Sequence, residues 1–302
     1  MSIKIDWLGC ATFRLVIDDL IIFLDAYMDR VASAPKVGLS ASQVDKADFV
    51  VVGHSHFDHI AGAETIAANT GAVVIGSNET ARVLYKEEIS RNQLRVAQGG
   101  ERYRLSDSVT MRVFPSLHSC IWIPDTFRPN TGDSRTGHLY LTEDEKWCCS
   151  PSSRAQATTT QHVNEDIIKH RKSTIGSSET GGALCYLIET TYGSIFYQDT
   201  SGCWTGVVSD LRADVAILAM AGRPNVDGEP IQGSLSDYIG VMTGMLKPRQ
   251  LILGHHDDWM PPQTRDNTTN QALLPVRERV ERTRPGIQLI QPSYLDSTRL
   301  LD

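Results

Sequence analysis

The stretch VVVGHSHFDHIAG, residues 50–62, places three histidines and one aspartate within six residues, directly after a run of valines. The valines end in a glycine, which is typical of a buried strand that leads into a loop. Apolar residues between positions 60 and 71 then recur with helical spacing. This part of the chain therefore predicts a strand, a polar loop and a helix in succession.

The spacing within the polar loop suits metal binding. His54 and His56 lie two residues apart on an extended loop, so both rings can point toward one ion. Asp58 and His59 open the expected helix and would face a second ion beside the first. Imidazole and carboxylate ligands together suit zinc, and manganese and iron(II) are the alternatives.

Three other residues of ligand type follow apolar segments that predict strands. His118 follows TMRVFPSL, Asp199 follows SIFYQ, and His255 follows QLILG. Each alone has an ordinary structural explanation: a hydrogen-bonded histidine, a turn residue or a solvated loop. Strand ends are where a sheet places functional side chains on loops, so the coincidence of all of them predicts a metal centre at one edge of the sheets.

The composition limits the classes of protein and of partner. The chain has 302 residues, 41% hydrophobic and 22% charged, with a formal net charge of −7. These values are typical of a globular protein, and because the net charge is negative and no basic run is present, we expect no nucleic-acid partner. No stretch reaches the roughly 20 apolar residues that cross a bilayer, so no membrane insertion is expected. The first 15 residues lack the features of a signal peptide, and a cytoplasmic location is expected.

Strand and helix patterns alternate in both halves of the chain, and one such helix is expected to begin with Asn78 as its N-cap. This rhythm predicts an α/β fold of four αββα layers, with two mixed sheets inside and helices outside. We expect a single domain over residues 1–302. The segment 119–182 has little periodicity and many polar residues. This predicts an irregular insertion, which is either a lid, a contact within a homo-oligomer or an unconstrained surface loop.

At this point the motifs resemble a known family. HSHFDH matches the HxHxDH signature of the metallo-β-lactamase fold superfamily, and the residues His118, Asp199 and His255 match its remaining ligands in order. The opening IDWLGCATFRL resembles the branch that contains L-ascorbate 6-phosphate lactonase and N-acyl phosphatidylethanolamine phospholipase D. In that branch the usual text resembles WLGHATF, so Cys10 stands where a histidine is usual.

The resemblance implies a centre of two ions, with zinc expected and Mn²⁺ or Fe²⁺ as alternatives. The ligands that it implies are, for one ion, His54, His56 and His118, and for the other Asp58, His59 and His255, with Asp199 bridging the two. His256 competes with His255, which we prefer because it comes first after the strand. Asp25 is expected to accept a hydrogen bond from a ligand histidine and thereby orient it.

The function implied is that of a hydrolase in which a hydroxide bridging the ions is the nucleophile and Asp58 transfers its proton. The expected substrate is a small ester, lactone or amide, as for a lactonase or esterase. A phosphodiesterase with the same two ions is the first alternative. A mononuclear iron oxidoreductase or sulfur dioxygenase is the second, and a binding module without activity is the third.

Overall fold

The computed structural model of the chain describes residues 2–120 and 165–301. Within these residues, two sheets of seven strands form the centre of the molecule. The first sheet, in spatial order, consists of β17 (Thr298–Leu300), β1 (Ile3–Trp7), β2 (Phe13–Ile17), β3 (Leu20–Leu24), β4 (Phe49–Val51), β5 (Val73–Gly76) and β6 (Leu94–Val96).

The second sheet consists, in spatial order, of β16 (Gln288–Ile290), β15 (Gln250–Gly254), β12 (Val215–Ala219), β10 (Gly193–Gln198), β9 (Leu184–Thr190), β8 (Thr110–Pro115) and β7 (Arg102–Arg104). A small third sheet joins β11 (Gly202–Cys203), β13 (Asn225–Val226) and β14 (Glu229–Pro230). Both large sheets contain parallel and antiparallel pairs, as expected from the sequence.

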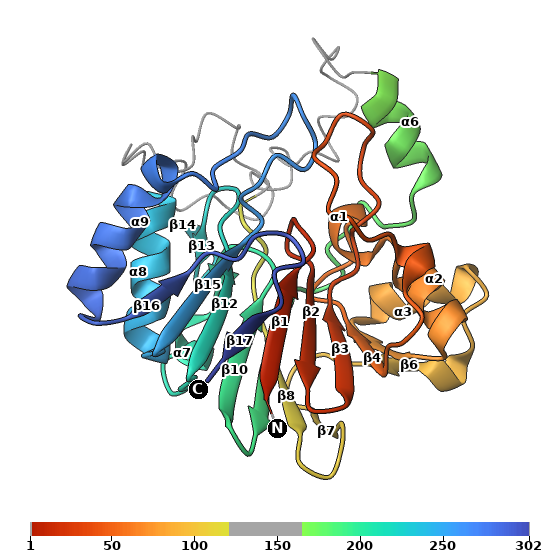
Figure 1. Cartoon of the computed structure of the whole chain (residues 1–302), viewed down its shortest axis with the longest axis horizontal. Helices are drawn as coiled ribbons and strands as arrows, with labels where there is room; N and C mark the ends of the chain where they lie inside the picture. The colour runs from red at the N-terminus through yellow and green to blue at the C-terminus, as the bar shows by residue number, and fades with distance from the viewer. Residues whose placement is uncertain (1, 121–164, 302) are drawn as a thin grey trace.

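Helices cover the outer faces of the two sheets. On one side lie α1 (Phe57–Ile60), α2 (Ala63–Thr70) and α3 (Asn78–Lys86), and on the other α7 (Thr205–Val208), α8 (Leu235–Leu246) and α9 (Asn270–Thr283). Figure 1 shows these two groups of helices on opposite sides of the paired sheets. The arrangement is the expected four-layer αββα fold.

Side-chain alternation along the strands explains the layers. In β12, Val215 and Ile217 belong to the apolar cluster between the two sheets. The intervening Ala216 and Leu218 belong to the cluster that also contains residues of α8 and α9. Because successive side chains of a strand point to opposite faces, one strand serves both layers, and such a strand is apolar throughout. All five residues of β12 are buried accordingly.

Strand direction brings the loops of both sheets to one edge. In the first sheet, β1, β3, β4 and β5 run in the same direction, since β1 and β3 are both antiparallel to β2, and β3, β4 and β5 are parallel. In the second sheet, β8, β10, β12 and β15 share one direction for the same reason. The carboxyl ends of strands in one sheet therefore meet at one edge.

Two local predictions differ from the structure. The single helix expected over residues 60–71 is divided into α1 and α2, because Gly62 between them adopts a left-handed φ of 102°. The N-cap of α3 is Ser77 rather than Asn78, and the Ser77 side chain accepts a hydrogen bond from the Thr80 amide.

The expected insertion over residues 119–182 is described only in part. Residues 165–173 form helix α6 (Glu165–Ser173), which is regular where an irregular segment was predicted. Ile167 is its one buried residue, whereas the adjacent Ile168 is exposed and the remaining residues are polar or charged. The helix therefore has little apolar periodicity. The predicted lid or oligomer contact at residues 121–164 lies outside the described residues.

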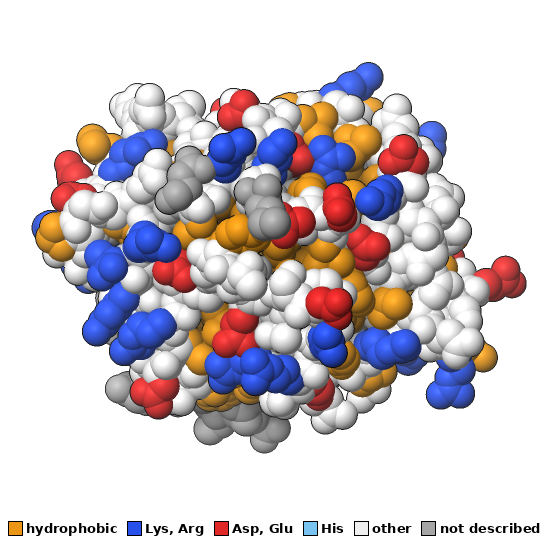
Figure 2. Space-filling view, turned by 60° about the horizontal axis from the view of Figure 1, so that its bottom comes forward, with side chains coloured by type: hydrophobic (Ala, Val, Ile, Leu, Met, Phe, Trp, Pro, Cys, Tyr) orange, Lys and Arg blue, Asp and Glu red, His pale blue; other side chains and the backbone are white. Residues whose placement is uncertain are grey.

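The surface is mixed in charge on the face that lies at the bottom of Figure 1. Figure 2 shows acidic and basic side chains intermixed there, with apolar side chains between them. Among the helices that the structure describes, none combines the length and the apolar character that crossing a membrane requires.

Candidate metal centre

The predicted ligand residues lie on loops that follow strands of both sheets. In the first sheet, Asp25 directly follows β3, and His54 comes three residues after the end of β4. In the second sheet, Asp199 directly follows β10, His255 directly follows β15, and His118 comes three residues after the end of β8. The two sheets thus contribute side chains to one site from opposite sides, as the strand directions require.

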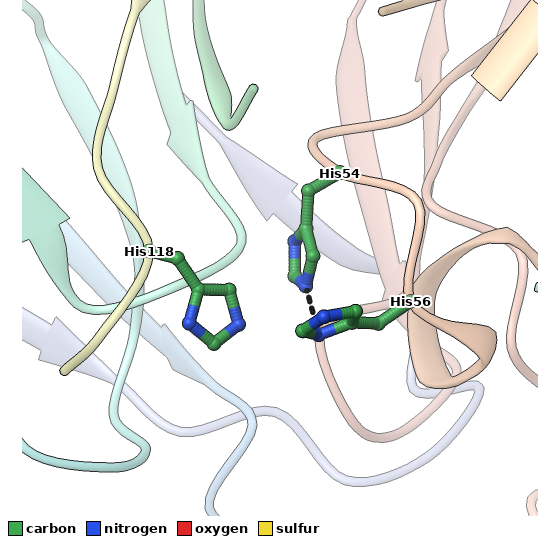
Figure 3. A group of neighbouring side chains, drawn as sticks. All are labelled: His54, His56 and His118. Carbon is green, nitrogen blue, oxygen red and sulfur yellow. Dashed lines mark hydrogen bonds between the residues drawn. The ribbon is translucent and has the colours of Figure 1, made fainter. Parts of the chain in front are cut away.

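Three histidines form the first group of possible ligands. His54 Nε2 lies 3.1 Å from His56 Nδ1, and the His118 ring centroid lies 4.7 Å from that of His54 and 4.8 Å from that of His56. Figure 3 shows His54 and His56 on one loop and His118 on the loop that faces it. His118 Nδ1 donates to the carbonyl of Ser119 at 2.8 Å, which leaves Nε2 as its lone-pair nitrogen.

The spacing of these nitrogens fits a tetrahedral metal ion. With metal–nitrogen bonds of about 2.0–2.1 Å, two ligand atoms of a tetrahedral zinc ion are about 3.3 Å apart. The 3.1 Å between His54 and His56 is close to that value. Burial lowers the pKa of all three histidines, well below the usual range for His54 and His118. The neutral imidazole that results at neutral pH is the form that binds a metal.

A second group lies beside the first and centres on Asp58. Its Oδ2 atom is 3.5 Å from Nε2 of His59 and 3.4 Å from Nε2 of His255. Burial by itself would raise the pKa of Asp58, but the neighbouring His59 and His255 hold it well below its usual range. One carboxylate oxygen thus lies between two imidazole nitrogens, a donor set of the kind that binds zinc, manganese or iron.

Two buried aspartates contact the histidines from behind. Asp25 Oδ2 accepts a hydrogen bond from His59 Nδ1 at 2.6 Å, and its Oδ1 accepts one from the Gly53 amide at 2.9 Å. Asp199 Oδ2 is 2.6 Å from His54 Nδ1 and 3.3 Å from His59 Nδ1. These contacts hold the Nδ1 protons, so the Nε2 lone pairs of both rings are directed into the site.

Asp199 is the predicted bridging ligand, and its second oxygen fits that prediction. Within the part of the chain that the structure describes, Asp199 Oδ1 is buried and has no hydrogen-bond partner. A buried carboxylate oxygen without a partner is costly unless a cation or another donor meets it. Burial also raises the pKa of Asp199 to about 6. A cation at this oxygen would remove the cost, although the bridging role itself stays a prediction.

The charge of the site also favours a cation. Asp25, Asp58 and Asp199 are all buried within one cluster. Burial would lower the pKa of His59, but the carboxylates of Asp58 and Asp25 outweigh it and raise that pKa to about 9. In the absence of a metal, the acidic groups thus favour the protonated, positively charged form of the buried His59. Divalent ions would supply that positive charge instead.

The structure separates the two adjacent histidines after β15. His255 has a left-handed φ of 61° and faces Asp58. His256 points the other way: its ring stacks on Trp7 with centroids 5.1 Å apart, and its Nε2 lies 3.1 Å from Gln291 Oε1. Of the two, only His255 is placed to serve as the predicted ligand.

Two contacts at the site were not expected from the sequence. Cys10 Sγ lies 3.6 Å from His255 Nδ1 and 3.5 Å from the backbone carbonyl of Asp58. Together with a carboxylate oxygen of Asp58 and a ring nitrogen of His255, it forms a further group of possible metal ligands. The His56 ring hydrogen-bonds to the backbone at Ser178. Cys10 could have been found, since it follows β1 at the same sheet edge as the ligands. Ser178 belongs to a polar loop with no motif, so nothing in the sequence marks it.

Comparison with known proteins concerns the family and the fold. A family model described as "Beta-lactamase superfamily domain" matches residues 21–146. The "UPF0173 metal-dependent hydrolase" of Caldivirga maquilingensis is 31% identical over 113 residues, which are 37% of this chain and 48% of that protein. The chain thus spans about half the length of the curated relatives that it matches first.

Solved structures share the fold over nearly the whole chain. Igni18, a metallo hydrolase from Ignicoccus hospitalis, aligns over 99% of this chain and 98% of its own, with a TM-score of 0.59 and 14% identity. CmlA, a diiron β-hydroxylase from Streptomyces venezuelae, aligns over 99% of this chain and 54% of its own, with a TM-score of 0.53 and 12% identity. These likenesses show the fold and leave the reaction open.

Proposed function

We propose that this chain is a member of the metallo-β-lactamase superfamily, which the family model and the relatives support, and that it is a metal-dependent hydrolase of a small ester, lactone or amide. The observation that carries the proposal is the position of Asp58, whose Oδ2 lies between Nε2 of His59 and Nε2 of His255. Around it, three possible ligand atoms come together in each of three groups: His54, His56 and His118; Cys10, Asp58 and His255; and His54, His59 and Asp199. We therefore propose that the site offers donors for two ions rather than one.

The residues divide between two ions as follows. We assign one ion to the three-histidine group of His54, His56 and His118, and the other to Asp58, His59 and His255, with Asp199 between them. Zinc suits this set of nitrogen and carboxylate donors, with Mn²⁺ and Fe²⁺ as the competing ions.

When bound, such ions supply an activated water and polarise the bond that it attacks. The protein's own part is to hold the donors in place and to move a proton. The low pKa of Asp58 keeps it a carboxylate at neutral pH. We assign it as the group that accepts the proton of the attacking water and returns it to the leaving group.

Aromatic side chains beside the site favour an apolar or ring-shaped substrate. The Trp259 ring lies 5.4 Å from that of His255, and it packs edge-on against Tyr27 at 5.9 Å. Phe57, which lies between two predicted ligands in the sequence, is 6.2 Å from Trp259. We propose that these rings form the wall against which the acyl part of the substrate packs.

The test combines metal analysis with a substrate screen. Protein purified without added metal is expected to carry two ions per chain, and to hydrolyse p-nitrophenyl esters or lactones. Asp58→Asn should reduce turnover about 10²- to 10⁴-fold, whereas the exposed Asp45→Asn should leave it unchanged. Unchanged turnover of Asp58→Asn at full metal occupancy would contradict the proton-transfer role. One iron and no zinc per chain would favour the oxidoreductase alternative.

A phosphodiesterase is the second candidate, and one observation favours it. The guanidinium of Arg171, on the exposed side of α6, lies 5.3 Å from the centroid of the Phe57 ring. A cation at that position could attract an anionic substrate. Arg171→Ala should then weaken hydrolysis of bis-p-nitrophenyl phosphate through KM and leave ester hydrolysis unchanged. The neighbouring Lys172→Ala, on the same exposed helix, is the control.

A further inference from the structure

Cys10 occupies a buried and conformationally unusual position next to the candidate metal centre. It comes three residues after β1, its side chain is fully buried, and its φ is 46°, in the left-handed region. A residue other than glycine in that conformation is uncommon unless its surroundings hold it there. The contacts of this residue explain what holds it.

Hydrogen bonds hold both the amide and the carbonyl of Cys10 in place. Its amide donates to Asp257 Oδ1 at 3.0 Å, and Arg30 pairs with Asp257 at 2.8 Å in the same buried region. Its carbonyl accepts hydrogen bonds from the His255 amide at 2.6 Å and from Trp7 Nε1 at 3.0 Å. The backbones of Cys10 and His255 are therefore joined directly, and neither can shift without the other.

The thiol bridges two predicted ligand residues. Cys10 Sγ donates to the backbone carbonyl of Asp58 at 3.5 Å, and it lies 3.6 Å from Nδ1 of His255. Once the thiol proton is directed at that carbonyl, sulfur is left as an acceptor for the Nδ1 proton of His255. The other nitrogen of the ring, Nε2, lies 3.4 Å from Asp58 Oδ2.

We propose that Cys10 is the positioning residue of His255: its sulfur holds the Nδ1 proton, so that the Nε2 lone pair faces the second ion. This inference rests on the proposed metal centre. Cys10 would do for His255 what Asp25 does for His59, whose Nδ1 donates to a carboxylate at 2.6 Å. Fixing the tautomer of a ligand histidine in this way increases metal affinity. Cys10 Sγ, a carboxylate oxygen of Asp58 and a ring nitrogen of His255 also lie within 4.8 Å of one another. Direct ligation by the sulfur is therefore the competing role, which the experiments below separate from positioning.

The proposal is tested by metal affinity and by the tautomer of His255, neither of which needs a substrate. Zinc affinity would be measured by competition with a chromophoric chelator for Cys10→Ala, Cys10→Ser and the control Cys203→Ala, a buried free cysteine outside the site. We expect Cys10→Ala to weaken one of the two ions about tenfold. Cys10→Ser, which keeps a donor and an acceptor, should recover most of that affinity, and Cys203→Ala should match the wild type.

The bound nitrogen of His255 is read from the imidazole ¹⁵N spectrum of the zinc-loaded wild-type protein. We expect Nε2 to bind the ion and Nδ1 to carry a proton, and we expect that proton to exchange with solvent faster in Cys10→Ala. Zinc bound through Nδ1 in the wild type, or wild-type affinity for both ions in Cys10→Ala, would overturn the proposal. This spectrum needs only the wild type, so the test survives if a variant fails to fold.

Cobalt substitution separates positioning from direct ligation. If sulfur bound the ion, the Co²⁺ protein would show a thiolate charge-transfer band that disappears in Cys10→Ala, and that result would also overturn the proposal. The experiments also distinguish failure of the proposed hydrolase function from failure of the positioning role. No turnover of any substrate, together with weakened zinc binding in Cys10→Ala, would remove the hydrolase function and support the positioning role.

Discussion

Asp25 supports the metal centre through two hydrogen bonds, and replacing it with asparagine tests that support. Its two oxygens accept from His59 Nδ1 at 2.6 Å and from the Gly53 amide at 2.9 Å. Asparagine has one acceptor oxygen, so its amide group must face one of these two donors. The variant therefore keeps the shape of the side chain but loses one hydrogen bond and its charge.

The size of the effect follows from the bond that is lost. A hydrogen bond to a charged group contributes about 1.5–3 kcal/mol, and 1.4 kcal/mol corresponds to about tenfold in affinity. If that bond orients His59, Asp25→Asn should bind the second ion about 10- to 100-fold more weakly. This range agrees with the effect of losing the hydrogen-bond partner of a metal ligand in other proteins.

Competition titration with a chelator measures this directly, with inductively coupled plasma analysis of the bound metal. The exposed Asp19→Asn serves as the matched control, since it makes the same chemical change away from the site. The three-histidine group should keep its ion in both variants. Wild-type affinity for both ions in Asp25→Asn would refute the argument that this hydrogen bond orients His59.

Two further predictions concern the packing and the charge around the site. A Cβ added at Gly53 would lie 2.1 Å from Asp199 Cγ, so Gly53→Ala should destabilise the protein by about 1–3 kcal/mol in urea unfolding and lower its metal content. Gly206→Ala, where a Cβ meets open space, is its control, and equal stability of the two would contradict the prediction. Hydrogen bonding to Arg82 lowers the pKa of Glu79 from 4.5 to about 2. Because the folded-state pKa is depressed, Glu79 should stabilise the protein above pH 4.5 and lose this effect as the pH falls toward 2. Denaturant unfolding of the wild type and Glu79→Gln should therefore converge at low pH, and a constant difference would argue against it.

The sequence by itself determined the αββα fold and most of the candidate site. Strand and helix periodicity are local properties, so apolar runs such as VVV before Gly53 identify strands without any knowledge of their neighbours. A strand end also says where its polar residues will lie, because parallel strands bring their carboxyl ends to one edge. The predicted ligands around Asp58 and His118 therefore lie at one edge of the sheets. This prediction did not require the spatial order of the strands.

Only the tertiary structure decided which of two adjacent residues faces the candidate metal centre. The periodicity of QLILGHHDD is the same for His255 and His256, and their separate directions come from a left-handed backbone and from stacking on Trp7 in the first strand. The same holds for Cys10, whose sulfur meets His255 only because β1 and β15 end at the same place. Such contacts join residues far apart in the chain, and no local pattern records them.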